Sequence, residues 1–133
     1  MLTEAQWHEL ATAARHATAD AYCPYSRFPV GAAVRTSDDR VFAGSNVENA
    51  SFGHTICAER NAIFQAVASG ARDIVALAVY TPTPACFTPC GACRQVLVEF
   101  GANAEVLSLC DGPEQARFTA ASLLPHRFAL PKG

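Results

Sequence analysis

Lysine is almost absent from this chain of 133 residues, in which Lys132 is the only one. Charged residues make up 17% of the sequence, and the formal net charge is −2. A surface that binds the phosphates of a polynucleotide needs clustered Lys and Arg side chains. We therefore expect no nucleic-acid partner.

Long apolar runs are lacking as well. No window approaches the roughly 18 continuous apolar residues of a membrane-spanning helix, so we expect no membrane partner. The opening segment MLTEAQWHEL has no basic region followed by an apolar run, so no export signal is visible. We therefore expect a cytoplasmic protein, in which the six cysteines are thiols or metal ligands rather than disulfides.

Half of the residues are hydrophobic, and the length suits one domain with a sizeable core, so we expect residues 1–133 to form a single domain. Apolar periodicity and turn residues predict that helices and strands alternate along the chain. The expected helices span residues 3–21, 56–69 and 91–100, with a brief one capped by Thr119. Thr3 and Gln6 have the spacing of a capping box at the start of the first helix, and Gly70 and Gly101 are expected to stop the second and third. The expected strands span residues 30–36, 41–46, 73–80, 104–110 and 115–119.

The strand pattern predicts how the sheet is built. The first two strands are joined by a polar turn, which is typical of a hairpin. The run 73–80 is apolar almost throughout, so we expect a central strand buried on both faces. The connection after Cys110 is too short for a crossover helix, so the last two strands should pair in antiparallel fashion. The sequence thus predicts an α/β fold with helices packed on one mixed, five-stranded sheet.

The segment PCGAC, residues 89–93, carries the strongest chemical signal. A Cys-x-x-Cys pair at a helix start brings both sulfurs close together, and the helix N-terminus stabilises thiolates. For this motif alone, a redox pair is the alternative. Cys57 also begins a predicted helix, so Cys57, Cys90 and Cys93 together offer three soft ligands, a set that favours zinc.

The fourth ligand decides whether such a zinc is structural or catalytic. A structural zinc needs four protein ligands, whereas a catalytic zinc keeps one position for water. His54 and Cys86 are the candidates to close the site, with Cys110 a more distant third, and spacing alone leaves this alternative open. Glu59 favours catalysis, because burying a carboxylate beside a zinc thiolate is costly unless it does chemical work.

Glu59 also has a simpler explanation, as an exposed acid in the first turn of a helix. Positions 57 and 59 point to nearly opposite sides of an ideal helix. Only at a frayed first turn could the long Glu side chain reach back past the helix end to the metal.

Motifs over most of the chain resemble one known family. Cys-Ala-Glu at 57–59 followed by PCGAC fits the zinc nucleobase-deaminase pattern, with Cys in place of the commoner His. Five segments between about residues 22 and 128 together resemble the small cytidine deaminases: YCPYSRFPVGAAV, FAGSNVENASFG, TICAERNAI, TPCGACRQVLVEF and LLPHRF. The resemblance implies a three-layer α/β/α sandwich and a homotetramer whose active sites are shared between subunits. It also implies a hydrolase of pyrimidine salvage that converts cytidine and deoxycytidine to uridine and deoxyuridine.

The resemblance further assigns roles to residues. Cys57, Cys90 and Cys93 would hold one zinc ion per subunit. Glu59 would carry a proton from water activated by the zinc to N3 of the base, and then protonate the departing ammonia. The implied nucleoside contacts are the backbone N–H of Ala58 and the carbonyl of Thr88 at the base, Phe28 against the pyrimidine, Asn46 and Glu48 at the ribose 3′-hydroxyl, and Phe128 reaching a neighbouring subunit's site.

Some of these residues have plainer explanations. Without the resemblance, Phe28 would be assigned to the core, and the segment NVENAS to a solvated turn. Two positions also depart from the family: Phe52 stands where Tyr is common, and His54 where a small or apolar residue is usual. Both departures concern substrate or interface contacts rather than the zinc chemistry.

Three thiolates give the zinc site a formal charge of −1, which makes it harder to lower the pKa of water. Two helix N-termini offset this charge, and Arg60 or Arg94 could donate hydrogen bonds to the sulfurs. We expect Arg60 to have this role. A surface charge is the alternative for either arginine.

Three other functions fit part of the pattern. Polynucleotide deaminases share the zinc motifs, but they need basic grooves and helical insertions that this chain lacks. Blasticidin-type nucleoside deaminases share much of the pattern, although the motif NVEN at 46–49 favours cytidine. A non-catalytic, zinc-stabilised interaction module would require His54 or Cys86 as a fourth ligand.

Overall fold

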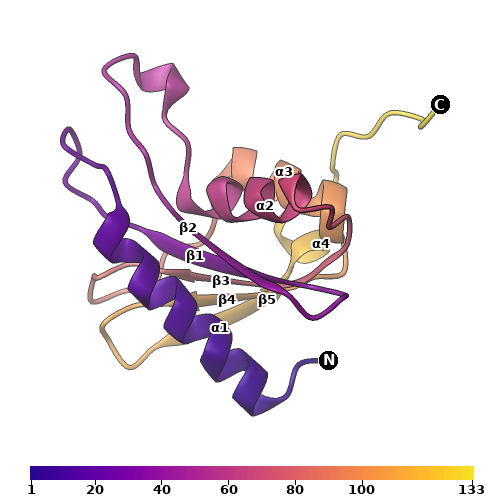
Figure 1. Cartoon of the computed structure of the whole chain (residues 1–133), viewed down its shortest axis with the longest axis horizontal. Coiled ribbons are helices and arrows are strands. Elements are labelled where there is room, and N and C mark those ends of the chain that lie inside the picture. The colour runs from indigo at the N-terminus through magenta and orange to yellow at the C-terminus, as the bar shows by residue number, and fades with distance from the viewer.

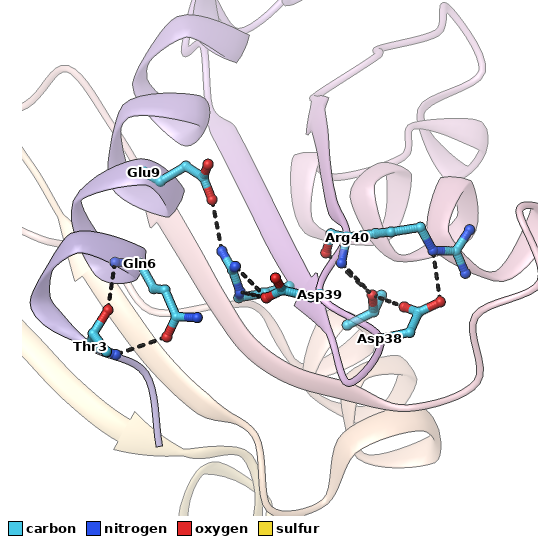
Figure 2. Close-up of polar contacts among 8 residues, drawn as sticks. Thr3, Gln6, Glu9, Asp38, Asp39 and Arg40 are labelled. Atoms are coloured by element: carbon cyan, nitrogen blue, oxygen red, sulfur yellow. Dashed lines mark hydrogen bonds and ion pairs between the residues drawn. The ribbon is translucent and has the colours of Figure 1, made fainter.

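Helix α1 (Glu4–Ala17) begins the computed structural model, which describes residues 1–133. The Thr3 side chain accepts a hydrogen bond from the Gln6 N–H, and the Gln6 side chain accepts one from the Thr3 N–H (Figure 2). This is the capping box that the sequence predicts. The helix ends before residue 21, because a 3₁₀ turn (Thr18–Asp20) follows it.

Five strands form one mixed sheet in the order β2-β1-β3-β4-β5. Their bounds are β1 (Gly31–Thr36), β2 (Val41–Ser45), β3 (Ile74–Tyr80), β4 (Glu105–Leu109) and β5 (Gln115–Thr119). Strand β1 pairs in antiparallel fashion with β2 and β3, β3 pairs in parallel with β4, and β4 forms an antiparallel hairpin with β5. The central place of β3 and the final hairpin confirm the predictions for this sheet.

Helices cover both faces of the sheet (Figure 1). Helix α1 lies on one face, while α2 (Ala58–Ala68), α3 (Gly91–Gly101) and the short α4 (Ala120–Leu123) lie on the other. Because side chains alternate along a strand, Ala32 and Val34 of β1 join the core beneath α2 and α3, while Ala33 joins the core beneath α1. The three-layer sandwich is therefore confirmed. None of these helices has the length and hydropathy needed to cross a bilayer.

Two glycines lie at the ends of the helices that carry the predicted site. Gly70 has a φ of +94° and follows the end of α2, where the sequence places the stop. Gly101, which is predicted to stop the next helix, is the last residue of α3, so the predicted end is confirmed to within one residue. A Cβ at this position would lie 2.3 Å from the Ile74 carbonyl oxygen, so Gly101 allows α3 to pack closely against β3.

Arg35 links α1 to the first hairpin through Glu9 and Asp39, which are labelled in Figure 2. This buried side chain of β1 contacts the Glu9 carboxylate of α1 at 2.7 Å and also donates to Asp39 in the following turn. Asp39, and then Glu9, raise the pKa of the guanidinium. This network holds α1 on its face of the sheet. The three cysteines lie at the starts of α2 and α3, which pack on the opposite face.

Candidate metal centre and nucleoside site

Three cysteine sulfurs converge where α2 and α3 begin. Cys57 is the N-cap residue of α2, Cys90 is the N-cap residue of α3, and Cys93 lies in the first turn of α3. The Sγ atoms of Cys57 and Cys90 are 3.7 Å apart, those of Cys90 and Cys93 are 3.5 Å apart, and all three lie within 4.8 Å of one another. Sulfurs on one tetrahedral zinc, each at about 2.3 Å, lie about 3.8 Å apart, so the cluster fits a zinc ion.

The surroundings of Cys57 favour its thiolate. The pKa of Cys57 falls to about 5, chiefly because the Cys93 thiol donates a hydrogen bond to its sulfur, and Arg60 adds to this effect. The Arg60 Nη2 lies 3.4 Å from the Cys57 Sγ, and the Arg60 Nε is buried without a hydrogen-bond partner. The guanidinium of Arg60 thus lies against the sulfurs, whereas Arg94 donates only to oxygen atoms.

Glu59 lies in the first turn of α2 and is only 5% exposed. Burial raises the pKa of its carboxyl group to about 7, and the charge of Cys57 adds to the increase. Glu59 in turn raises the pKa of Cys93, after the larger effects of the hydrogen bond to Cys57 and of burial. Its carboxyl group therefore lies within electrostatic reach of two of the sulfurs.

The opposite directions that an ideal helix predicts for positions 57 and 59 do not apply to this chain. Cys57 precedes the helix with extended backbone angles, φ −69° and ψ 156°, and only the residues after it are helical. The N-cap residue does not have helical backbone angles. The direction of its side chain therefore does not follow the 100° rotation per residue of the helix.

None of the three candidates for a fourth protein ligand joins the cluster. His54 is exposed, and its Nδ1 lies 2.9 Å from the Ser51 hydroxyl. The Sγ atoms of Cys86 and Cys110 lie 3.1 Å apart, and Cys86 also contacts the Glu114 carbonyl at 3.2 Å. These two cysteines form a separate pair of thiols at the end of β4, so the closed four-ligand site that spacing left open is not formed.

Asn46 and Glu48 hold the segment that carries Phe28. The Asn46 Oδ1 accepts from the Val30 N–H at 2.9 Å, and its Nδ2 donates to the Phe28 carbonyl at 2.8 Å. The Glu48 carboxylate accepts from the backbone N–H groups of residues 25 and 26, at 3.0 and 3.1 Å, and from the hydroxyl of residue 26. No local sequence pattern predicts this scaffolding role, because the partners lie 16 to 23 residues away in sequence.

Aromatic side chains stand at the surface near these segments. Phe28 is 37% exposed and packs edge to face on Phe87 with ring centroids 5.4 Å apart. No sequence motif predicts a role for Phe87, although this residue directly precedes Thr88 in the loop before PCGAC. Thr88 is exposed, whereas Ala58 is buried at the start of α2. Phe128 is 70% exposed, and its carbonyl oxygen accepts from the Gln95 Nε2 at 3.0 Å.

Two cavities of the chain lie away from the cysteines. A cavity of about 750 Å³ lies between the N-terminal residues and the end of α3, and one of about 550 Å³ lies between α1 and β2. Neither is lined by the three cysteines, by Glu59 or by Phe28. These two cavities are therefore separate from the predicted site.

Comparison with known proteins gives concordant matches. The model of the family described as "Cytidine and deoxycytidylate deaminase zinc-binding region" matches residues 5–109. The cytidine deaminase of Halalkalibacterium halodurans is 50% identical over 110 residues, which cover 81% of this chain and 83% of that protein. The cytidine deaminase of Mycobacterium tuberculosis is 41% identical over 129 residues, which cover 97% and 94%. The crystal structure of cytidine deaminase from Burkholderia pseudomallei superposes with a TM-score of 0.88 at 45% identity, over 96% of this chain and 100% of that one.

Proposed function

The chain belongs to the cytidine deaminase family, and on this premise we propose that it is a zinc-dependent enzyme that hydrolyses cytidine to uridine and ammonia. The observation that carries the proposal is the cluster of Cys57, Cys90 and Cys93 beside the buried carboxyl group of Glu59. We include deoxycytidine as a substrate and pyrimidine salvage as the role. The bond broken is the exocyclic C–N bond of a cyclic amidine.

The three cysteines would hold one zinc ion per chain. When bound, zinc supplies a Lewis acid that lowers the pKa of water and so makes a nucleophile available near neutral pH. Arg60 supports the cysteines by donating to the Cys57 sulfur, which offsets part of the negative charge of three thiolates. The N-termini of α2 and α3 act in the same direction.

Glu59 moves the protons of the reaction. With a pKa of about 7, its carboxyl group takes up and releases a proton near neutral pH. It takes one proton from the attacking water and delivers it to N3 of the cytosine ring. It then passes the second proton of the same water to the amino group at C4, which leaves as ammonia. Cytidine and water thus give uridine and ammonia, with no other reactant.

Backbone and side-chain groups around the cluster would bind the nucleoside. The N–H of Ala58 and the carbonyl of Thr88 offer a donor and an acceptor to the base, and Phe28 offers an aromatic face. Asn46 and Glu48 would bind the ribose 3′-hydroxyl. Their hydrogen bonds to the segment of Phe28 leave both groups with spare capacity, because an amide has two donor hydrogens and a carboxylate has about four acceptor positions.

The assembly that we propose is a homotetramer with shared active sites. One feature supports it: Phe128, which the family resemblance assigns to a neighbouring subunit's site, is 70% exposed and so is available to a neighbour. We also propose a cytoplasmic location, because none of the six cysteines is in a disulfide, which is typical of proteins in a reducing compartment.

Two measurements on the purified protein test this function. Zinc content should reach one ion per chain, and the absorbance of cytidine should fall as uridine forms. Bound zinc without deamination of any pyrimidine nucleoside would instead support a non-catalytic zinc module. Competition among cytidine, deoxycytidine and blasticidin then ranks the substrates, and we expect the two natural nucleosides to be preferred.

A further inference from the structure

Arg94 follows the last cysteine of the cluster and donates three hydrogen bonds from one guanidinium group. Its Nε donates to the Pro89 carbonyl at 2.7 Å, its Nη2 to the Thr88 hydroxyl at 2.8 Å, and its Nη1 to the Leu123 carbonyl at 3.0 Å. The side chain is half-buried. It therefore joins the loop before α3 to the last residue of α4.

The loop that Arg94 holds has little other support. Residues 86–89 take part in no backbone–backbone hydrogen bond, and Pro89 has no N–H to donate. The Cys86 thiol contacts carbonyl groups of residues 108 and 114, but it does not reach residues 88 and 89. Within the chain, Arg94 alone supplies hydrogen bonds to the two residues that precede Cys90. Because Pro89 is fully buried, its carbonyl oxygen would be unsatisfied without that guanidinium.

This placement separates Arg94 from the metal chemistry. The guanidinium of Arg60 contacts a cysteine sulfur, whereas that of Arg94 contacts only oxygen atoms. Two of its acceptors flank the peptide group that joins Thr88 to Pro89. The carbonyl oxygen of that peptide group is the acceptor that the proposed function assigns to the base.

We propose that Arg94 is a positioning residue for base recognition. Its planar guanidinium fixes the orientation of the Thr88–Pro89 peptide, so that the Thr88 carbonyl oxygen accepts a hydrogen bond from the 4-amino group of cytosine. The inference rests on the proposed function and deepens it. Lysine cannot replace this residue, because an ammonium group does not present three donors in a fixed planar fork.

Kinetics of Arg94→Lys and Arg94→Gln test the proposal. A displacement of about 1 Å at a substrate contact costs up to about 100-fold, so we expect kcat/KM for cytidine to fall between about 10-fold and about 100-fold. Zinc content should stay at the wild-type value. Competitive inhibition by uridine should be unchanged or stronger, because its O4 accepts hydrogen bonds and gains nothing from the Thr88 carbonyl.

A matched control and a coupled variant sharpen the test. Arg72 also donates to two backbone carbonyl oxygens, but at the far end of α2, so Arg72→Gln should leave both cytidine turnover and uridine inhibition unchanged. Thr88→Val removes one acceptor of Arg94 and keeps the backbone carbonyl. Its effect should be in the same direction and smaller, and adding it to Arg94→Gln should cost little more than Arg94→Gln alone.

The outcomes separate the inference from the proposed function. Wild-type kcat/KM in Arg94→Lys, or loss of zinc, overturns the positioning role. Equal weakening of cytidine and uridine binding also overturns it, because a merely structural role affects both nucleosides alike. If Arg94→Gln does not fold, Arg94→Lys and Thr88→Val still decide the matter. A wild-type protein that deaminates no pyrimidine nucleoside overturns the proposed function, and this inference with it.

Discussion

Glu59 owes its proposed chemistry to its surroundings rather than to its residue type. An exposed glutamate is ionised at neutral pH, whereas burial beside the cysteines raises the pKa of this one to about 7. Glu59→Gln keeps the size of the side chain and removes the titratable carboxyl group. We expect kcat for cytidine to fall by at least about 100-fold, which is the lower range for a general acid or base. Absorbance assays measure kcat, and metal analysis should show unchanged zinc content.

Glu99 offers a control for the Glu59 variant. It is an exposed glutamate of α3 whose carboxylate lies 3.9 Å from the Lys132 ammonium. Glu99→Gln removes the same charge at the surface, and its kcat should equal that of the wild type. Wild-type kcat in Glu59→Gln would contradict the proton-transfer role.

Arg60 acts on the sulfurs through charge, so its removal should affect turnover more than metal binding. Arg60→Ala removes the contact of 3.4 Å to the Cys57 sulfur while leaving all three cysteines in place. Loss of this outer partner should lower kcat by about 10-fold to 100-fold. Zinc content should change less than kcat. Arg60→Lys keeps the charge and should recover part of the rate, whereas an unchanged rate in Arg60→Ala would rule out the role.

At this scale the sequence predicts the groups that carry chemistry better than those that support them. The Cys-x-x-Cys spacing predicts that the sulfurs of Cys90 and Cys93 lie close together, because positions i and i+3 are neighbours at a helix start. The place of Cys57 beside them, 33 residues away in sequence, is predicted by the family resemblance. The partners of Asn46 and Glu48 depend on how a loop 16 to 23 residues away returns to the sheet. No local sequence pattern predicts contacts between residues so far apart, so the scaffolding role of these two residues is seen only in the folded structure.

Helix α2 carries Glu59 and begins directly after Cys57. Gly44 of β2 allows this helix to pack closely on the strand. A Cβ at Gly44 would lie 2.6 Å from the Ala62 nitrogen and 2.9 Å from the Ala58 carbonyl oxygen. Both are backbone atoms of α2, so Gly44→Ala must push the helix outward. We expect the variant to lose about 1–3 kcal/mol of stability, the usual cost of overpacking. Chemical denaturation measures this loss.

The same displacement should reach the site, because α2 moves as a rigid element. We expect Gly44→Ala to lower kcat/KM for cytidine in protein that is still folded. Gly53→Ala is the matched control, since a Cβ at Gly53 meets no atom within 4 Å. Equal stability and equal kinetics in the two variants would show that the contact between α2 and β2 does not position the site.

The elements themselves were largely predictable, and the errors lie at their ends. Thr3 and Gln6 fix the start of α1 through local hydrogen bonds, as the sequence predicts. Gly101 ends α3 as predicted, but it also allows a close approach to Ile74 of β3, which the sequence does not predict. A glycine that allows packing and a glycine that ends a helix look alike in the sequence, because the difference lies in a neighbour brought by the fold.

In the whole molecule, the sheet order brings the two helix starts together. Helices α2 and α3 are separated in sequence by β3 and its flanking loops, and they lie on the same face of the sheet (Figure 1). Their first residues therefore supply sulfurs to one cluster from positions 57, 90 and 93. Hydrophobic patterns predict a mixed sheet, but they do not contain the order β2-β1-β3-β4-β5. The three-layer sandwich is predicted by the family resemblance and not by periodicity alone.

Phe128 lets the shared active sites of the proposed homotetramer be tested by mixing two inactive proteins. The side chain lies after α4 and is 70% exposed. If Phe128 completes a neighbour's site, Phe128→Ala chains retain Glu59, and Glu59→Gln chains retain Phe128. A site built from one chain of each kind then has both groups. We expect each variant alone to have low activity, and a reassembled equal mixture to regain activity at about a quarter of its sites, as random assembly of paired subunits gives.

The mixing experiment excludes the simpler arrangement directly. If Phe128 serves the site of its own chain, every site in the mixture lacks either Glu59 or Phe128, and activity stays at the level of the separate variants. Each variant is dissociated and reassembled alone as the control for the treatment, and sedimentation before and after mixing checks that the same oligomer forms. Recovery therefore requires both an oligomer and an aromatic side chain that crosses its interface, which the sequence of one chain predicts only through the family resemblance.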